Sequence, residues 1–419
     1  MKAGFGKAEI VFPIEMLPTE SFCAIHDNPH VRMMYIESAT DLMALAVIEL
    51  VNVPEEEIAY TRTVISEMMK VPYENVWVQM THAIATPHNP GPMGPPDKRP
   101  PLTERHIEQR KMFSAAIRRA VDAAALETKA DIEEAKLGWG NGYCDANQNR
   151  DIESPWGWWI GVGGEGYSNK DMKVMKVENL AGKVKGLYVN YAVKPCAIDN
   201  AGMKTGTRQI SSECCGFASL TAEEAFGAPV LYTVAAAGDQ VTKKTAMIDS
   251  VENGQTVLTD LGVETGFACA EEVGKLLSDS IISIAASITA EETNPKTGWE
   301  SLSFDWETVG FGGRRVLTKE FKFVGSGKKA PFTAELFRLG DAILVADRPE
   351  TLSQTEKELI AACPVKHMCL MVMVNGEKKY LPDMRSCQRG TWEAQSTFYM
   401  PGVAEKFVEE AARCMEKLA

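Results

Sequence analysis

The sequence predicts an α/β protein with a mixed β-sheet core flanked by helices. Stretches with the apolar runs of buried strands alternate with stretches of helical periodicity along the chain, which is typical of this class. The 419 residues are 45% hydrophobic, which is enough to fill a large core. Neither an internal repeat nor a low-complexity linker divides the chain. We therefore expect a single domain over residues 1–419.

The first elements are predicted from hydrophobic periodicity. Residues 40–51 form an apolar run of strand or short-helix character, and residues 76–80 have the pattern of a buried strand. Residues 55–69, between them, are predicted to be a helix because their apolar side chains recur on one stripe. That stripe consists of Ile58, Val64, Ile65 and Met68.

A loop, a long helix and a second irregular region follow. Residues 86–103 contain seven prolines and two glycines, which excludes regular structure and predicts a loop. Residues 104–136 have one apolar face and form the clearest predicted helix. Residues 138–169 are rich in Gly, Asn and Trp and follow neither period, so we expect an ordered loop region that walls a pocket.

The rest of the chain repeats the alternation. The predicted strands are residues 173–177, 184–193, 230–236, 332–339, 342–346 and 369–374. The predicted helices are residues 269–288, residues 353–363 and the amphipathic segment after Pro401.

Charge and cysteine usage exclude several classes of partner. A net charge of −13 opposes binding to nucleic acid phosphates or to anionic lipid surfaces, so we expect neither nucleic acid nor a membrane as partner. The N-terminus has no apolar signal segment, and the ten cysteines lack the CxxC spacing of a zinc site, which favours a cytoplasmic protein. A small-molecule substrate is the expected partner. A homo-oligomer is compatible with the sequence, although no feature decides it.

Several short motifs follow one another in a distinctive order. They are Gly4-Phe5-Gly6-Lys7-Ala8-Glu9-Ile10, Thr81-His82-Ala83-Ile84-Ala85-Thr86-Pro87, Asn147-Gln148-Asn149-Arg150, Val189-Asn190-Tyr191-Ala192-Val193-Lys194-Pro195, Ser212-Glu213-Cys214-Cys215-Gly216, Ala237-Gly238-Asp239-Gln240, Arg348-Pro349-Glu350-Thr351, Asn375-Gly376 through Tyr380, and Trp392-Glu393. Their order and spacing resemble the catalytic domain of the neutral ceramidases over about residues 3–400.

This resemblance implies a set of site residues. It implies that His82, Glu350 and Tyr380 are ligands of a zinc ion or another divalent metal, and that Arg150 faces the substrate. It also places Asp239 beside the active site.

The remaining candidates surround these residues. Trp392 stands in place of the tyrosine expected to contact the scissile group, and Glu393 follows it in the substrate site. Lys194, together with Arg150, Asp239 and Tyr380, completes the expected catalytic set. His88, in the proline-rich loop, is a candidate substrate-binding residue and a possible extra ligand.

The chain departs from the family at two ligand positions. Ile84 stands where a second histidine is expected, and Lys194 stands where another zinc-binding histidine is expected. An ammonium about 4 Å from a divalent ion would be repelled by roughly 8 kcal/mol at an effective dielectric constant near 20. Four solutions exist: Lys194 is neutral, Lys194 is carbamylated, His88 supplies the missing nitrogen, or the ammonium replaces the metal.

Ordinary structural roles are the alternatives for individual residues. Glu350 could cap the helix that begins near Ser353, Tyr380 could be a half-buried strand aromatic, and Arg150 could pair with Asp145 or Asp151.

Three functions follow from this set. The first is metal-assisted hydrolysis of a carbon–nitrogen bond in a small soluble amide or cyclic amide. The second is a metal-independent lyase or isomerase that uses Lys194 as base or electrophile. The third is a non-catalytic ligand-binding protein that has kept the pocket.

Overall fold

An eight-stranded mixed sheet forms the centre of the computed structural model, which describes residues 1–92, 99–310 and 315–419. The strand order is β13-β11-β10-β6-β1-β3-β4-β5. The strands are β1 (Lys2–Glu9), β3 (His30–Glu37), β4 (Leu42–Ile48), β5 (Val76–Met80), β6 (Glu133–Tyr143), β10 (Asp171–Asn179), β11 (Val184–Tyr191) and β13 (Val230–Val234). The pairs β4–β5 and β11–β13 are parallel, and the other neighbours are antiparallel.

A second sheet packs on one face of the first. It has the order β17-β18-β19-β21 and consists of β17 (Thr297–Val309), β18 (Gly325–Leu339), β19 (Ala342–Asp347) and β21 (His367–Met371). The two inner faces share one apolar cluster, in which Trp77 of β5 meets Trp299 of β17 edge to face at 5.4 Å. Burial of this interface joins the first and last thirds of the chain into one core.

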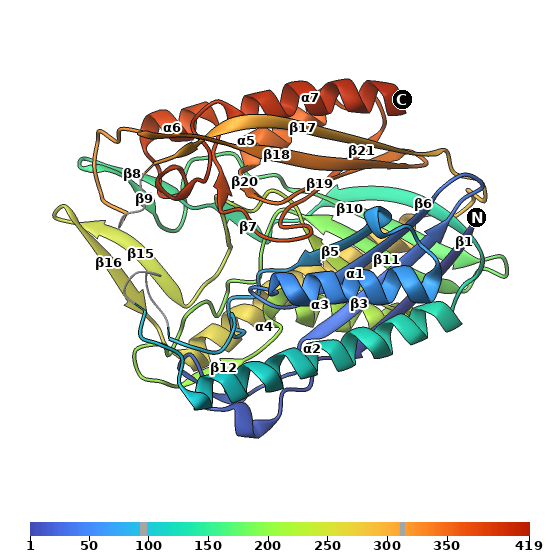
Figure 1. Ribbon diagram of the computed structural model, residues 1–419, viewed down its shortest axis with the longest axis horizontal. Helices are drawn as coiled ribbons and strands as arrows, with labels where there is room; N and C mark the ends of the chain where they lie inside the picture. The colour runs from blue at the N-terminus through green and yellow to red at the C-terminus, as the bar shows by residue number, and fades with distance from the viewer. Residues whose placement is uncertain (93–98, 311–314) are drawn as a thin grey trace.

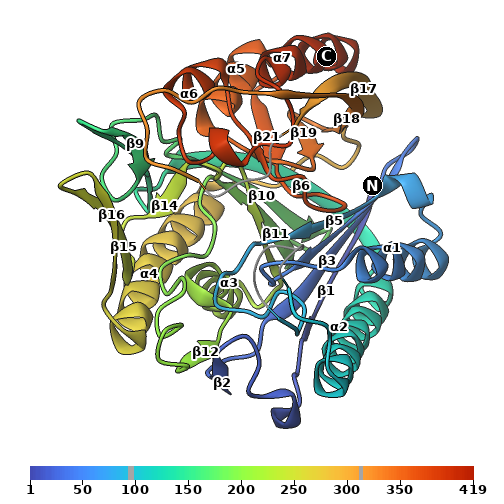
Figure 2. The ribbon, with the colours of Figure 1, turned by 60° about the vertical axis from the view of Figure 1, so that its left-hand side comes forward.

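Helices cover the two outer faces, so the molecule has four layers (Figure 1; Figure 2). Helices α1 (Glu55–Met69), α2 (Glu104–Ala130), α3 (Glu213–Phe226) and α4 (Val263–Ser287) contact the eight-stranded sheet. Helices α5 (Ser353–Ala362) and α7 (Val403–Leu418) contact the second sheet, and the short α6 (Met384–Arg389) lies beside them. Helix α7 buries Val403, Phe407 and Ala411, which recur every fourth residue on one face.

Short strand pairs connect these layers. They are β2 (Phe22–Ile25) with β12 (Arg208–Ile210), β7 (Asn147–Asn149) with β14 (Gln240–Thr242), β8 (Asp151–Ser154) with β9 (Gly157–Ile160), β15 (Met247–Glu252) with β16 (Gln255–Asp260), and β20 (Glu350–Thr351) with β22 (Tyr380–Leu381). The β8–β9 and β15–β16 hairpins project at the end of the molecule opposite the N-terminus (Figure 1).

The predicted fold class is confirmed, and several predicted elements coincide with observed ones. The helix at residues 55–69 and the strand at residues 76–80 have the predicted bounds. The strands near residues 173–177, 184–193, 230–236, 332–346 and 369–374 and the three later helices are also present. Residues 86–92 and 99–103 contain neither helix nor strand, and residues 93–98 of that predicted loop lie outside the described residues.

Two predictions between residues 104 and 169 were wrong. Helix α2 ends at Ala130, and β6 begins at Glu133, where strong helix formers are overridden by pairing with β1 and then with β10. The expected loop region at 138–169 contains the rest of β6 and the strands β7, β8 and β9. The glycines at its start alternate because the end of helix α4 and the two residues after it pack against them. A Cβ at Gly138 would lie 2.5 Å from the carbonyl oxygen of Thr289, one at Gly140 would lie 2.6 Å from Ile288, and one at Gly142 would lie 2.8 Å from Ile284 of α4.

Gln79 brings together two strands that lie at opposite ends of the eight-stranded order. Its buried amide in β5 donates to the carbonyl of Val234 in β13 at 2.8 Å and accepts from the Val234 backbone N–H at 3.2 Å. It also donates to the carbonyl of Val372, just after β21, at 2.8 Å. The ends of β5, β13 and β21 therefore meet at one place.

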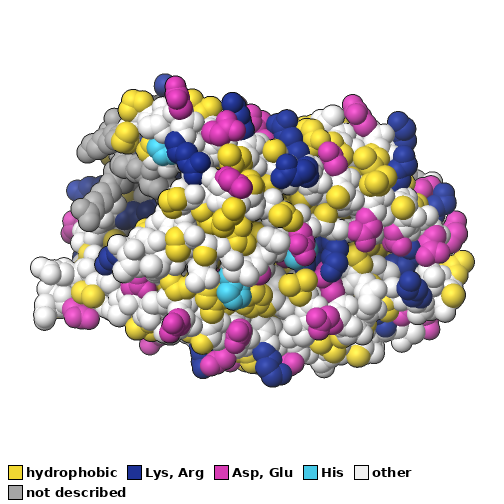
Figure 3. All heavy atoms as spheres, turned by 90° about the horizontal axis from the view of Figure 1, so that it is seen from below, with side chains coloured by type: hydrophobic (Ala, Val, Ile, Leu, Met, Phe, Trp, Pro, Cys, Tyr) yellow, Lys and Arg dark blue, Asp and Glu magenta, His cyan; other side chains and the backbone are white. Residues whose placement is uncertain are grey.

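The surface carries mixed charges. Figure 3 shows acidic, basic and hydrophobic side chains interspersed over one face. Among the helices that the structure describes, none has the length and apolar character needed to cross a bilayer.

Candidate functional site

The expected site residues come from the ends of neighbouring strands. His82 follows β5, and Lys194 follows β11. Glu350 and Tyr380 face each other in register on the parallel pair β20–β22, so their side chains lie on the same face. Strand ends are where α/β proteins commonly place polar site residues, because the backbone there no longer pairs in the sheet.

Lys194, Glu350 and His82 form a buried group that we call the lysine cluster. The Lys194 ammonium donates to Glu350 Oε2 at 2.5 Å, and both side chains are at most 3% exposed. His82 Nε2 lies 3.8 Å from Glu350 Oε1, and its Nδ1 has no partner among the described residues. His82 has a φ of 59°, an uncommon conformation for a non-glycine residue, held by a hydrogen bond from its N–H to the Leu50 carbonyl.

The charges of the lysine cluster follow from this geometry. Burial opposes ionisation of Glu350, but Lys194 and His82 overcome it and lower the pKa of the carboxyl to about 2. Burial also opposes the charge on Lys194, yet Glu350 and Tyr380 raise the pKa of the ammonium to about 12. Burial lowers the pKa of His82 to about 4, although Glu350 acts in the opposite direction. At neutral pH the cluster therefore holds an ammonium, a carboxylate and a neutral imidazole.

Arg150, Glu393, Tyr380 and Asp151 form a second buried group, the arginine cluster. Arg150 Nε donates to Glu393 Oε1 at 2.7 Å, and its Nη2 donates to the Tyr380 hydroxyl at 3.3 Å. Glu393 is fully buried, and Arg150 is 13% exposed. Burial raises the pKa of Tyr380, which keeps it a neutral phenol. Arg150 therefore pairs with Glu393 and not with Asp145 or Asp151.

Asp151 adds a second carboxyl to the arginine cluster. Burial raises its pKa well above the ordinary aspartate range, and the nearby Glu393 and Asp239 carboxylates add to the effect. Asp151 Oδ1 and Glu393 Oε2 are buried and find no donor in the described part of the chain when both groups are ionised. A proton kept on Asp151 lets it donate to Glu393, which satisfies the pair.

Aromatic contacts join the clusters. The Lys194 ammonium lies 5.5 Å from the centre of the Tyr380 ring, and Trp392 meets that ring edge to face at 5.7 Å. The guanidinium of Arg150 lies over Trp392 at 5.3 Å, and that of Arg315 lies over the same ring at 3.4 Å.

Asp239 and His88, two further predicted residues, lie beside these clusters. Asp239 accepts from Asn149, Gln240 and both the backbone N–H and the hydroxyl of Ser353, so its carboxyl ties β7 to the start of α5. Burial raises its pKa to about 6. The geometry gives Asp239 a positioning role.

His88 is held at the edge of the site by Glu20. Its Nδ1 lies 3.1 Å from Glu20 Oε2, and 41% of its side chain is exposed. At the other departure from the family, Ile84 makes hydrogen bonds through its backbone: its carbonyl accepts from Arg208 at 2.6 Å, and its N–H donates to the Pro195 carbonyl at 3.2 Å.

The donor set does not fit a divalent metal as long as Lys194 is charged. The ammonium is bonded to the carboxylate that would bind the ion, and Tyr380 is a neutral phenol. No group of three His, Cys, Asp or Glu side chains suited to a metal converges within residues 1–92, 99–310 and 315–419.

Sequence reasoning did not identify Glu20, Arg315 or the role of Asp151. Glu20 and Arg315 belong to none of the motifs, and they reach the site through contacts with residues distant in the chain. From the sequence, Asp151 is a candidate only as a partner of Arg150. Its position directly after Arg150 in a segment without helical period was the one available signal.

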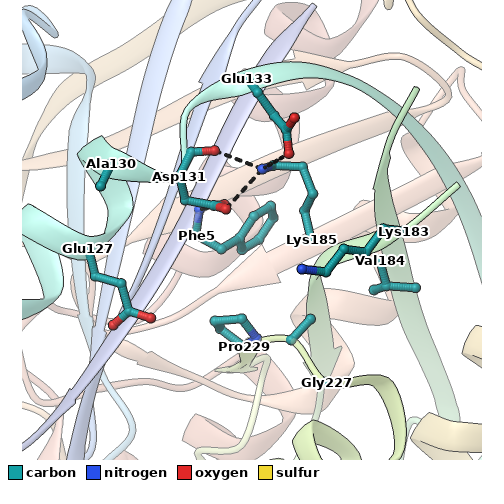
Figure 4. Close-up of a pocket in the computed structure, with 11 residues that line it drawn as sticks. Phe5, Glu127, Ala130, Asp131, Glu133, Lys183, Val184, Lys185, Gly227 and Pro229 are labelled. Atoms are coloured by element: carbon teal, nitrogen blue, oxygen red, sulfur yellow. Dashed lines mark hydrogen bonds and ion pairs between the residues drawn. The ribbon is translucent and has the colours of Figure 1, made fainter. Parts of the chain in front are cut away.

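A surface pocket of about 370 Å³ lies elsewhere, between the end of α2, the start of β11 and the turn before β13 (Figure 4). Lys185 points towards Asp131 and Glu133 there and is within 3.0 Å of both carboxylates. The lining contains no residue of the lysine or arginine cluster.

Comparison with known proteins relates the fold to solved structures. No family model matches the chain, and no curated protein matches its sequence. The structure is similar to that of a neutral ceramidase from Pseudomonas aeruginosa, with a TM-score of 0.69 and 16% sequence identity over 100% of this chain and 74% of that one. It is also similar to a ceramidase complexed with C2, with a TM-score of 0.68 and 15% identity over 100% of this chain and 75% of that one. The chain therefore has a ceramidase-like fold.

Proposed function

We propose that this protein hydrolyses the carbon–nitrogen bond of a small soluble amide or cyclic amide. Ceramidases are amide hydrolases, and the shared fold supports the same class of reaction. The observation that carries the proposal is the pair of buried clusters at the strand ends. Packing alone does not explain them, because buried ion pairs seldom stabilise a protein relative to apolar side chains of similar size.

The clusters supply the groups that amide hydrolysis needs. The Lys194 ammonium and the Tyr380 phenol can donate to the oxygen that becomes negative when the carbonyl is attacked. The neutral His82 has an unpartnered ring nitrogen that can accept a proton from the attacking water, and Glu350 can stabilise the imidazolium. That proton then passes to the leaving nitrogen as the carbon–nitrogen bond breaks.

Metal assistance belongs to this proposal only with a modified lysine. A carbamylated Lys194 would remove the ammonium and add a carboxylate ligand beside Glu350, His82 and Tyr380. The second candidate, a lyase or isomerase with Lys194 as base or electrophile, needs a neutral amine, which the raised pKa of about 12 opposes.

The test is an amidase assay with and without a chelator. Purified protein is incubated with a panel of small linear and cyclic amides, with its metal content measured by mass spectrometry. We expect hydrolysis that survives chelation and falls by about 10² or more in Lys194→Met. No turnover of any amide, with tight binding of one, would favour a binding protein, and elimination or isomerisation products would favour the second candidate.

A further inference from the structure

Three cations surround Trp392 and Tyr380, and one of them differs from the others. Lys194 is neutralised by Glu350, and Arg150 is neutralised by Glu393. Arg315 makes no ion pair with any carboxylate in the described part of the chain. The site therefore has one positive charge that the protein does not neutralise.

Contacts with residues 392–396 hold Arg315 beside the site. Its guanidinium stacks on Trp392 at 3.4 Å, and its Nε donates to the Ser396 hydroxyl. The next residue is also held, because Val316 exchanges two hydrogen bonds of 2.8 Å with the Gln395 amide. These contacts position the cation without removing its charge.

The terminal nitrogens of Arg315 are available for a ligand. The residue is exposed, and within the described part of the chain its only hydrogen bond comes from Nε, so neither Nη atom is engaged there. Trp392 also contacts Tyr380 and Arg150, so Arg315 lies one aromatic ring away from the groups proposed to act on the amide. A guanidinium stacked on an aromatic ring presents its planar edge outwards, where two N–H groups match a carboxylate.

We propose that Arg315 binds a carboxylate of the substrate, so that the preferred amides carry a negative charge beyond the scissile bond. This inference rests on the proposed hydrolase function. With an overall charge of −13, the protein's long-range field does not attract anions, so recognition depends on this local cation. The substrate class is thus an amide of the N-acylated amino acid type, rather than a neutral or amine-bearing one.

The experiment compares two probes that differ in one charge, N-acetylglycine and N-acetylglycinamide. Binding is measured by calorimetry for wild type, Arg315→Gln and Arg315→Lys. The matched control is Arg62→Gln. Arg62 lies on helix α1, stacks on Tyr73 at 4.1 Å and belongs to neither cluster. We expect Arg315→Gln to weaken binding of N-acetylglycine about ten-fold or more and to leave N-acetylglycinamide unchanged, because a charge-assisted hydrogen-bonded pair is lost. Arg315→Lys should lie between, and Arg62→Gln should match the wild type.

Other outcomes would overturn the inference. They are an equal effect of Arg315→Gln on both probes, no effect on either, or no binding of N-acetylglycine by the wild type. A preference of the wild type for the amine-bearing N-(2-aminoethyl)acetamide would overturn it as well. The hydrolase proposal fails separately. If no amide is turned over but N-acetylglycine binding is lost in Arg315→Gln, the anion site stands and the reaction class is wrong.

Discussion

The lysine cluster and the arginine cluster each pair one buried cation with one buried glutamate. In the lysine cluster, Glu350 has a single cationic partner at 2.5 Å and a pKa lowered to about 2, so its charge is constant above acid pH. In the arginine cluster, Glu393 shares its surroundings with Asp151, whose pKa is raised. The first cluster fixes a charge, whereas the second contains a carboxyl that can gain or lose a proton.

This difference predicts unequal tolerance to mutation. Removing Lys194 leaves a buried carboxylate with no cation to neutralise it. Removing the charge of Glu393 lets Asp151 ionise and take over the partnership with Arg150. The predictions below test this contrast, from the largest expected effect to the smallest.

Lys194→Met should have the largest effect. We expect a loss of about 3–5 kcal/mol in the free energy of unfolding, because an unpaired charge is left buried. We also expect kcat/KM for amides to fall by about 10² to 10³, since a donor to the oxyanion is lost. Urea unfolding measures the loss of stability, and steady-state kinetics measure the fall in kcat/KM.

The double variant Lys194→Met/Glu350→Gln is the control for this prediction. It should recover part of the stability but none of the activity, because it removes the unpaired charge without replacing the donor. Wild-type stability in the single variant would show that Lys194 does not hold Glu350.

Lys194→His should convert the lysine cluster into a metal site. With His82, Glu350 and Tyr380 it provides four donors, so we expect about one zinc ion per chain after dialysis against zinc. The wild type, treated in the same way, should bind much less. Stoichiometric zinc in the wild type would instead indicate a carbamylated or neutral Lys194.

Glu393→Gln should destabilise the protein by about 1–2 kcal/mol, less than Lys194→Met does. The side-chain amide introduced at position 393 can still accept a hydrogen bond from Arg150, and Asp151 can become the counter-ion of Arg150. Urea unfolding at neutral pH gives the value, and a double-mutant cycle with Asp151→Asn tests the substitution of one carboxyl for the other. A loss equal to that in Lys194→Met would remove the contrast between the clusters.

Asp151→Asn should have the smallest effect, which is visible in the pH dependence. Because the folded-state pKa is raised, the native protein binds more protons than the unfolded chain from about pH 4 upwards, until Asp151 itself ionises. This group therefore makes stability fall as pH rises through that window. Asparagine mimics the protonated acid and should flatten that part of the profile. The free energy of unfolding, measured between pH 4 and pH 9 on the wild type and on Asp151→Asn, tests this. Equal slopes of that free energy against pH in the two proteins would contradict the prediction.

Local pattern explains which elements could be predicted. The helix at residues 55–69 and the strand at 76–80 contain their own periodicity, so their bounds follow from the residues alone. Strand β6 could not be predicted, because Glu133, Glu134 and Lys136 favour a helix and only pairing with β1 and β10 makes them a strand. Its alternating glycines have a reason only once α4 is packed against them.

The sequence by itself determined the fold class, the strand-end positions of the candidate residues and the conflict that Lys194 creates in a metal site. Only the tertiary structure decided the partner of each charge. Lys194 and Glu350 are 156 residues apart, and Arg150 and Glu393 are 243 apart. No local pattern encodes such pairs. They form because folding removes water from both partners at one place, and each buried charge then requires the nearest opposite one.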